Sequence, residues 1–223
     1  MDIKLVVQAL VKFFVGMILI ALLIFIPAGS IFFWNGWIFM GLLFIPMFLV
    51  GLILIKKNPY LLQSRLKARE KSKEQGFLIF LSGIMFILGF IVAGCNYRFK
   101  WIILPSWLVC IGGIIFIISY LLYGIVLKEN TFLSRTIEVQ KNQKVIDTGL
   151  YGLVRHPMYC VSIFLFLSSA IVLNSLPTFV IFLVYPILIF IRMNKEEIFL
   201  EKELEGYREY KKKVKYKIIP YIY

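Results

Sequence analysis

The sequence predicts an all-α, multispanning integral membrane protein, a helical bundle with about five to six membrane helices. Of the 223 residues, 61% are hydrophobic, and the mean hydropathy is +0.87. The apolar residues form long runs, most of which reach the ~20 residues that one helical crossing needs. The links between the runs are alternately basic and nearly uncharged, as expected when successive helices cross in opposite directions. A soluble globular domain is excluded.

The apolar runs define six segments, of which the first four have the length of ordinary membrane helices. The small residues after the first run resemble a signal cleavage site, but its basic flank is weak, so we expect a retained first helix. The last two runs are shorter than the ~20 residues of a normal crossing, and we expect them to form a short helical hairpin. The segments are residues 5–26, 31–55, 77–96, 101–127, 158–174 and 176–191.

The charges predict the orientation of the bundle. The chain has 25 Lys and Arg against 12 Asp and Glu, a net charge of +13. The basic residues gather at the N-terminus, at 56–76, at 128–155 and in the tail 192–223, which places both termini in the cytoplasm. The membrane would be the cell membrane in a bacterium or the endoplasmic reticulum in a eukaryote. Anionic lipid headgroups explain these charges better than nucleic acid, because no nucleic-acid module is recognisable.

The cysteines and the histidine predict no metal site. Cys95, Cys110 and Cys160 lie within or at the edge of apolar segments, without CxxC or Cys/His spacing. The chain has one histidine, so a zinc or haem site is not expected. We interpret the cysteines as small apolar residues.

Residues 148–159, which read TGLYGLVRHPMY, join a polar loop to an apolar segment and hold the histidine, His156. Pro157 is well placed in the first turn of a helix, so Arg155 and His156 lie at that helix's N-terminus. A helix N-terminus with two cationic or donor side chains can bind an anion. The alternative is that Arg155 only marks the end of a membrane helix and His156 caps it.

A second polar cluster follows the last apolar segment. Arg192 and Glu196 are four residues apart and share a helix face, and Glu197 lies on the next face. Carboxylates at a membrane exit are costly unless cations match them. The alternative is a solvated amphipathic tail. Because an antiparallel hairpin brings both clusters to one end, we expect a pocket at the water–lipid boundary, suited to a zwitterionic cofactor and a lipid-borne acceptor.

Taken together, these motifs resemble a known family. The stretch 148–159, the EExxL at 196–200 and the pattern GYxxYxxxVxYxxIP at 206–220 are similar to the isoprenylcysteine carboxyl methyltransferases, which group with the phospholipid N-methyltransferases. Leu150 stands where proline is usual, and Lys217 stands where arginine is common. The resemblance covers roughly 130–220, so we expect N-terminal membrane helices in 1–127 and a cofactor-binding core with a cytoplasmic cap in 128–223.

The resemblance implies S-adenosylmethionine as the cofactor. Glu196 and Glu197 would hold its ribose hydroxyls or amino group, and two tyrosines of the tail would close the cap. The cofactor-binding residues implied by the motifs are Gly149, Tyr151, Arg155, His156, Pro157, Tyr159, Glu196, Glu197, Tyr207 and Tyr210.

The resemblance also implies a lipid or prenylated acceptor, which is expected to carry a carboxylate. A carboxylate has a reference pKa of ~4 and is already ionised, so transfer needs mostly alignment and water exclusion. Arg192 or a lysine of the tail would orient a carboxylate acceptor, and a glutamate such as Glu196 would take or tolerate the proton of an amine. The open alternatives are a phospholipid amine acceptor, an NADPH-dependent reductase of the sterol-reductase type, and a non-enzymatic lipid-binding protein.

Overall fold

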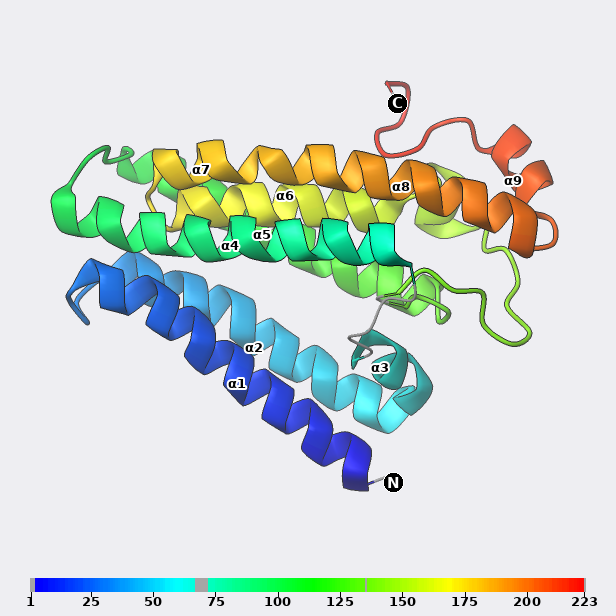
Figure 1. Cartoon of the computed structure of the whole chain (residues 1–223), viewed down its shortest axis with the longest axis horizontal. Helices are drawn as coiled ribbons and strands as arrows, with labels where there is room; N and C mark the ends of the chain where they lie inside the picture. The colour runs from blue at the N-terminus through cyan, green and yellow to red at the C-terminus, as the bar shows by residue number, and fades with distance from the viewer. Residues whose placement is uncertain (1–2, 67–71, 135, 223) are drawn as a thin grey trace.

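A computed structural model describes residues 3–66, 72–134 and 136–222, and within these ranges every regular element is a helix (Figure 1). The predicted fold class is confirmed. Five helical stretches are long and apolar enough to cross a membrane, the last of which joins α7 and α8. The elements are α1 (Ile3–Ala28), α2 (Trp34–Lys57), α3 (Pro59–Leu66), α4 (Lys73–Phe99), α5 (Ser106–Glu129), the 3-10 helix η1 (Gly149–Gly152), α6 (Pro157–Val172), α7 (Leu176–Phe182), α8 (Val184–Glu203) and α9 (Tyr207–Lys213).

The predicted hairpin is present, but its second arm is longer than the apolar pattern suggested. α6 has 16 residues, about 24 Å at ~1.5 Å per residue, and is shorter than a bilayer core. α7 and α8 lie end to end, and together they span the 28 residues Leu176–Glu203. The break between them falls at Leu183, because Pro186 cannot donate a backbone hydrogen bond to the preceding turn. The helix therefore carries the charged residues after 191 out of the apolar region.

Helices α4, α5, α6 and α7–α8 run side by side, whereas α1 and α2 slant away from them (Figure 1). α1 touches α4 closely at the end that follows Ile24: a Cβ on Gly94 would lie 2.4 Å from the Ile24 carbonyl oxygen. From that contact the α1–α2 pair diverges from α4 toward the end of the bundle that holds α3 (Figure 1). Residues of both α2 and α4 line the cavity described below.

Aromatic side chains from four helices fill the core. Phe39 of α2, Phe90 of α4, Phe116 of α5 and Phe182 of α7 are at most 7% exposed. The rings of Phe90 and Phe182 meet edge to face at 5.9 Å, an arrangement that aromatic pairs favour. Large apolar side chains also cover the outside of the bundle, as a membrane protein requires.

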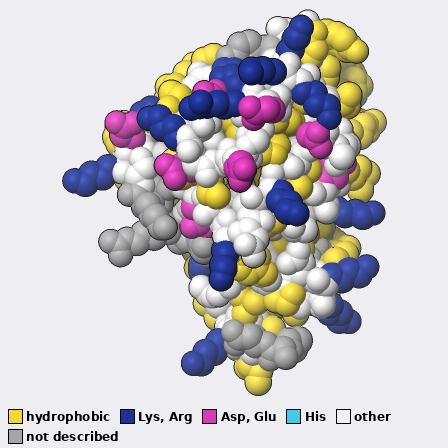
Figure 2. All heavy atoms as spheres, turned by 90° about the vertical axis from the view of Figure 1, so that its right-hand side faces the viewer, with side chains coloured by type: hydrophobic (Ala, Val, Ile, Leu, Met, Phe, Trp, Pro, Cys, Tyr) yellow, Lys and Arg dark blue, Asp and Glu magenta, His cyan; other side chains and the backbone are white. Residues whose placement is uncertain are grey.

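α3, α9 and both ends of the described chain lie at the same end of the bundle (Figure 1), and Lys and Arg gather on that face (Figure 2). The segment 56–76, predicted as a basic loop, instead includes α3 and the start of α4, because Pro59 begins a helix whose Leu61 and Leu62 are buried. Its residues Lys67, Arg69, Glu70 and Lys71, and Arg135 of the next basic segment, lie outside the described residues. That this end faces the cytoplasm stays a prediction from charge.

Candidate functional site

The Arg-His-Pro motif begins α6 as predicted, with Pro157 in its first turn and His156 at the N-cap. His156 does not cap the helix with its side chain. Instead, the chain before α6 pairs with the C-terminal tail: the Arg155 and His156 N–H groups donate to the Tyr216 and Lys217 carbonyls at 2.9 and 2.8 Å. The tail is thus held directly against the start of α6, and the His156 side chain is available for another contact.

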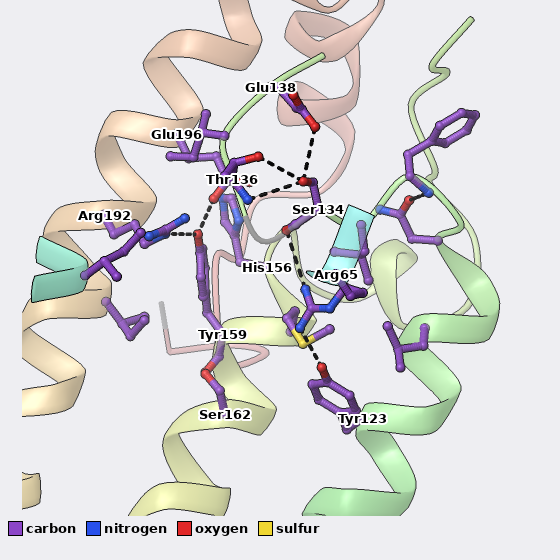
Figure 3. A pocket seen from close by; sticks show the side chains of 18 of the residues that line it. Arg65, Tyr123, Ser134, Thr136, Glu138, His156, Tyr159, Ser162, Arg192 and Glu196 are labelled. Atoms are coloured by element: carbon purple, nitrogen blue, oxygen red, sulfur yellow. Dashed lines mark hydrogen bonds between the residues drawn. The ribbon is translucent and has the colours of Figure 1, made fainter. Parts of the chain in front are cut away.

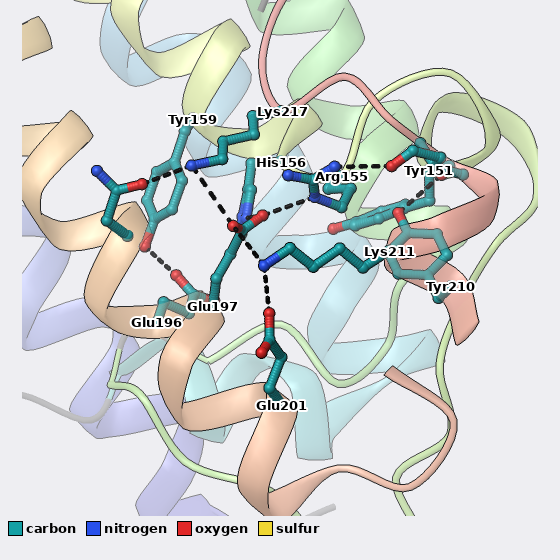
Figure 4. Close-up of polar contacts among 12 residues, drawn as sticks. Tyr151, Arg155, His156, Tyr159, Glu196, Glu197, Glu201, Tyr210, Lys211 and Lys217 are labelled. Carbon is teal, nitrogen blue, oxygen red and sulfur yellow. Dashed lines mark hydrogen bonds and ion pairs between the residues drawn. The ribbon is translucent and has the colours of Figure 1, made fainter. Parts of the chain in front are cut away.

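That contact is made with Glu197, which lies at the centre of a cationic cluster (Figure 4). Its Oε1 accepts from Arg155 Nε at 2.6 Å and lies 3.2 Å from His156 Nε2. Its Oε2 lies 3.5 Å from Lys217 Nζ and 3.8 Å from Lys211 Nζ. The Glu197 side chain is only 4% exposed, so this charge is matched as a buried carboxylate requires.

Arg155 also fastens the tail. Its Nη1 donates to the Val214 and Lys215 carbonyls, each at 2.7 Å. One guanidinium therefore links α8, through Glu197, to the chain that follows α9. The arrangement uses the planar fork of arginine, which a lysine could not reproduce.

Glu196 belongs to a different set of contacts on the neighbouring face of α8. The Tyr159 hydroxyl donates to Glu196 Oε2 and accepts from Arg192 Nε, the latter at 3.2 Å. The Tyr159 ring stacks on the His156 ring, with centroids 5.5 Å apart. Arg192, Tyr159 and Glu196 thus form one wall that joins α6 to α8 (Figure 3).

This wall lines a cavity of about 760 Å³ with two contrasting ends. The polar end lies under α9, where Arg155, His156 and Glu196 reach the cavity. The apolar end lies between α2 and α4, and its walls are Met47, Val50, Gly51 and Leu54 on one side and Leu78, Ile79, Ser82, Gly83 and Phe86 on the other. The volume falls in the usual range for small-molecule sites.

Most of the predicted site residues line this cavity, and three do not. The lining residues are Tyr151, Arg155, His156, Tyr159, Arg192, Glu196, Tyr207 and Tyr210. Glu197 lies behind the wall in its cationic cluster, and Pro157 starts α6 without lining the cavity. The cofactor contacts assigned to all of these residues stay predictions.

Gly149 serves a neighbouring carboxylate rather than the cavity. Its φ is +56°, and a Cβ there would lie 2.1 Å from Glu129 Oε1. The next residue, Leu150, donates its N–H to Glu129 Oε2 at 2.9 Å. Glycine is needed here both for the left-handed conformation and for the close approach of Glu129.

Tyrosines close the polar end of the cavity. The Tyr210 hydroxyl donates to the Tyr151 carbonyl at 2.8 Å, which ties α9 to η1. The Tyr207 hydroxyl is buried and has no hydrogen-bond partner within the described part of the chain. Burial, and then the nearby Glu197 and Glu196 carboxylates, raise the pKa of Tyr207, so its phenol stays a neutral donor. Tyr207 thus lines the cavity with a buried donor that lacks a partner among the described residues.

Arg65 of α3 also reaches this cavity, and the sequence did not point to it. Its Nη2 donates to the Tyr123 hydroxyl at 2.5 Å, and its Nη1 lies 3.5 Å from the Ser134 carbonyl. The sequence feature that could have indicated Arg65 is its spacing from Leu61 and Leu62. These leucines are buried, and Arg65 lies at the edge of the helix face that they form. Because many basic residues surround Arg65 in the sequence, this spacing did not stand out.

Residues 101–206 match the family model described as phospholipid methyltransferase. The chain carries a domain of this family. It is the family that includes the isoprenylcysteine carboxyl methyltransferases, so the resemblance seen in the motifs is confirmed. The matched segment runs from just before α5 to the start of α9 and contains both polar clusters. No curated protein matches the chain. Together with the apolar helices, this match supports a membrane methyltransferase.

Proposed function

We propose that the protein methylates a lipid-borne or prenylated acceptor that carries a carboxylate, with S-adenosylmethionine as the methyl donor. The observation that carries the proposal is the continuous cavity. It joins a polar chamber, built by the family's motifs, to an apolar passage between two membrane helices. A soluble cofactor and a membrane-embedded acceptor can approach one point from these two ends.

The polar chamber fits a zwitterionic cofactor. Glu196 supplies a negative charge, Arg155 and His156 supply donors, and the buried Tyr207 hydroxyl lacks a partner among the described residues. These groups match the amino, carboxylate and ribose hydroxyl groups of S-adenosylmethionine. When bound, this cofactor supplies an electrophilic methyl group on a sulfonium ion.

The chain's own residues would orient the acceptor and exclude water. Arg192 faces the cavity beside Tyr159 and is suited to hold an acceptor carboxylate. The ionised carboxylate needs no base, so the wall only has to align it. α9 and its tyrosines cover the polar end and limit the access of water. With an amine acceptor, Glu196 would have to receive a proton.

Two glycines support the apolar end as the acceptor's route. Gly51 of α2 and Gly83 of α4 line the cavity, and a Cβ on either would meet no atom within 4 Å. The space beside the helix is therefore open at both positions. A lipid chain can occupy such a groove without displacing protein atoms.

The test is calorimetric binding of S-adenosylhomocysteine to the detergent-purified protein, beside NADPH. We expect micromolar binding of S-adenosylhomocysteine, weakened at least tenfold by Glu196→Gln, because the carboxylate faces the chamber. The matched control is Glu203→Gln, an exposed residue of the same helix, which should bind as the wild type does. Binding of NADPH alone would move the assignment to a reductase. A folded protein that binds neither molecule would refute the cofactor assignment and leave the lipid-binding alternative.

A second assay separates the acceptor classes. Methyl transfer from radiolabelled S-adenosylmethionine is followed with a prenylated cysteine and with phosphatidylethanolamine, each in mixed micelles. Transfer to the prenylated cysteine supports the carboxylate acceptor. Transfer to phosphatidylethanolamine alone would replace it with a phospholipid amine.

A further inference from the structure

We propose that Arg65 binds the anionic group of the acceptor, a carboxylate or a phosphate, and so selects which lipids enter the site. The inference rests on the proposed function and adds to it a residue outside the segment that matches the family model, which begins at residue 101. It makes α3, the short helix between the first two membrane helices and the rest of the bundle, part of the acceptor site.

Arg65 is oriented into the cavity by neutral groups. Tyr123 of α5 accepts from Nη2 at 2.5 Å, and the Ser134 carbonyl lies 3.5 Å from Nη1. The guanidinium carbon lies 5.7 Å from the centre of the Tyr123 ring. These contacts fix the direction of the side chain but do not neutralise its charge.

Its charge has no carboxylate partner among the described residues. Glu138, on the same loop as Ser134, accepts from the Ser134 hydroxyl at 3.3 Å. A guanidinium has five N–H donors, and its contacts with Tyr123 and Ser134 leave donors for a ligand. The cavity wall holds apolar side chains such as Leu54, Leu62 and Leu66 as well as the polar Ser134, Thr136 and Glu138. A half-buried cation in such a wall is costly unless an anion pairs with it.

The position of Arg65 favours the acceptor over the cofactor as the source of that anion. Arg65 lies across the cavity from Arg192, on the side of α3 and α5 (Figure 3). Arg65 belongs to α3, and its hydrogen-bond partners belong to α5 and the loop that follows it, so none of them is on α9. A lipid whose chain lies between α2 and α4 would therefore bring its polar end between these two arginines. Two arginines facing one another favour an anionic headgroup and disfavour a cationic one.

The experiment measures lipid binding directly, so it does not depend on finding the natural substrate. Fluorescent dodecanoate, dodecyl phosphate and the neutral dodecanol analogue are titrated into the wild type, Arg65→Gln, Arg65→Lys and the control Lys57→Gln in neutral detergent. Lys57 is an exposed basic residue at the end of α2. We expect Arg65→Gln to weaken the binding of the anionic probes at least tenfold and to leave the binding of the neutral probe unchanged. Arg65→Lys should fall between, because it keeps the charge but loses the fork. Lys57→Gln should match the wild type.

The two anionic probes distinguish the sources of the charge. If Arg65→Gln loses affinity for dodecanoate alone, Arg65 binds a carboxylate. If it loses affinity for dodecyl phosphate alone, Arg65 binds a phospholipid phosphate. Equal binding by the wild type and Arg65→Gln would overturn the proposal.

Binding of S-adenosylhomocysteine to the same variants completes the test. Arg65→Gln should bind it as the wild type does, and a matched loss would show that Arg65 holds the cofactor instead. If the wild type fails to bind S-adenosylhomocysteine but shows the Arg65 effect on anionic lipids, the proposed function fails and the anion site remains. If the wild type binds S-adenosylhomocysteine but Arg65→Gln does not change the binding of anionic lipids, the proposed function stands and the anion site at Arg65 is refuted.

Discussion

Glu197→Gln should destabilise the protein strongly, because it removes the negative charge around which the end of the bundle is assembled. The glutamine has the same shape but leaves the buried Arg155 guanidinium without its counter-charge and the buried His156 ring without its carboxylate partner. Their side chains are 4% and 6% exposed. Removing one partner of a buried ion pair costs about 3–5 kcal/mol.

The contacts of Glu197 support the same magnitude. Hydrogen bonds to charged groups contribute about 1.5–3 kcal/mol each, and Glu197 has two such contacts, to Arg155 at 2.6 Å and to His156 at 3.2 Å. Lys217 and Lys211 are farther away and their side chains are 20% and 41% exposed, so solvent screens them and they contribute less. The amide of glutamine retains one acceptor oxygen, which places the expected loss near the lower limit, about 3 kcal/mol.

The loss should appear first in the C-terminal cap, because Arg155 also holds the Val214 and Lys215 carbonyls. The assay is thermal unfolding in detergent together with tryptic cleavage at the lysines 211–213. Glu201→Gln is the control, since its ion pair with Lys211 is partly exposed and such pairs contribute less than about 1 kcal/mol. If Glu197→Gln unfolds and is cleaved no faster than Glu201→Gln, the reasoning about the buried cluster is refuted.

Three other predictions concern the passage, the packing and the chemistry. Gly83→Leu should narrow the apolar passage and raise the KM for a lipid acceptor at least tenfold, without weakening the binding of S-adenosylhomocysteine. The control is Gly113→Leu on α5, where the space is equally open but lies outside the cavity, and it should change neither quantity. Gly94→Ala should lower the free energy of unfolding by about 1–3 kcal/mol, because overpacking forces α1 and α4 apart. The added Cβ would lie 2.4 Å from the Ile24 carbonyl oxygen. Thermal unfolding measures the loss, and Gly124→Ala, whose Cβ would meet no atom within 4 Å, is the control. With a carboxylate acceptor of pKa ~4, kcat/KM should stay flat from about pH 7.5 to 9.5. A rise of nearly tenfold per pH unit over that range would indicate that an amine must first lose its proton.

The fold was predictable wherever apolar length alone decides the element. The first four runs each became a membrane helix within a few residues of the expected bounds. The pattern failed where a helix continues past its apolar part, as α8 does through Arg192 to Glu203. Charged residues there are compatible with a helix, because they lie beyond the apolar region and pair with the loop and tail. Hydropathy predicts where a helix leaves the lipid but not where its backbone hydrogen bonding ends.

The site was predictable as a set of motifs but not as a network. The sequence pointed to residues that meet at one end of the bundle, and Arg155, His156 and Tyr159 do approach the two glutamates. It could not predict that the tail would pair with the chain before α6, because backbone contacts such as Arg155 N–H to the Tyr216 carbonyl leave no side-chain signature. It also missed Arg65, which reaches the cavity through the path of α3 and not through any motif.

The two adjacent glutamates show most clearly what the three-dimensional arrangement adds. Successive residues on a helix point about 100° apart, so Glu196 and Glu197 cannot share one role. Glu197 faces the cationic cluster and holds the cap, whereas Glu196 faces the cavity through Tyr159. A double substitution would combine a folding defect with a binding defect and could not be interpreted. Separate glutamine substitutions divide the two effects: loss of S-adenosylhomocysteine affinity at full stability belongs to Glu196, and loss of stability belongs to Glu197.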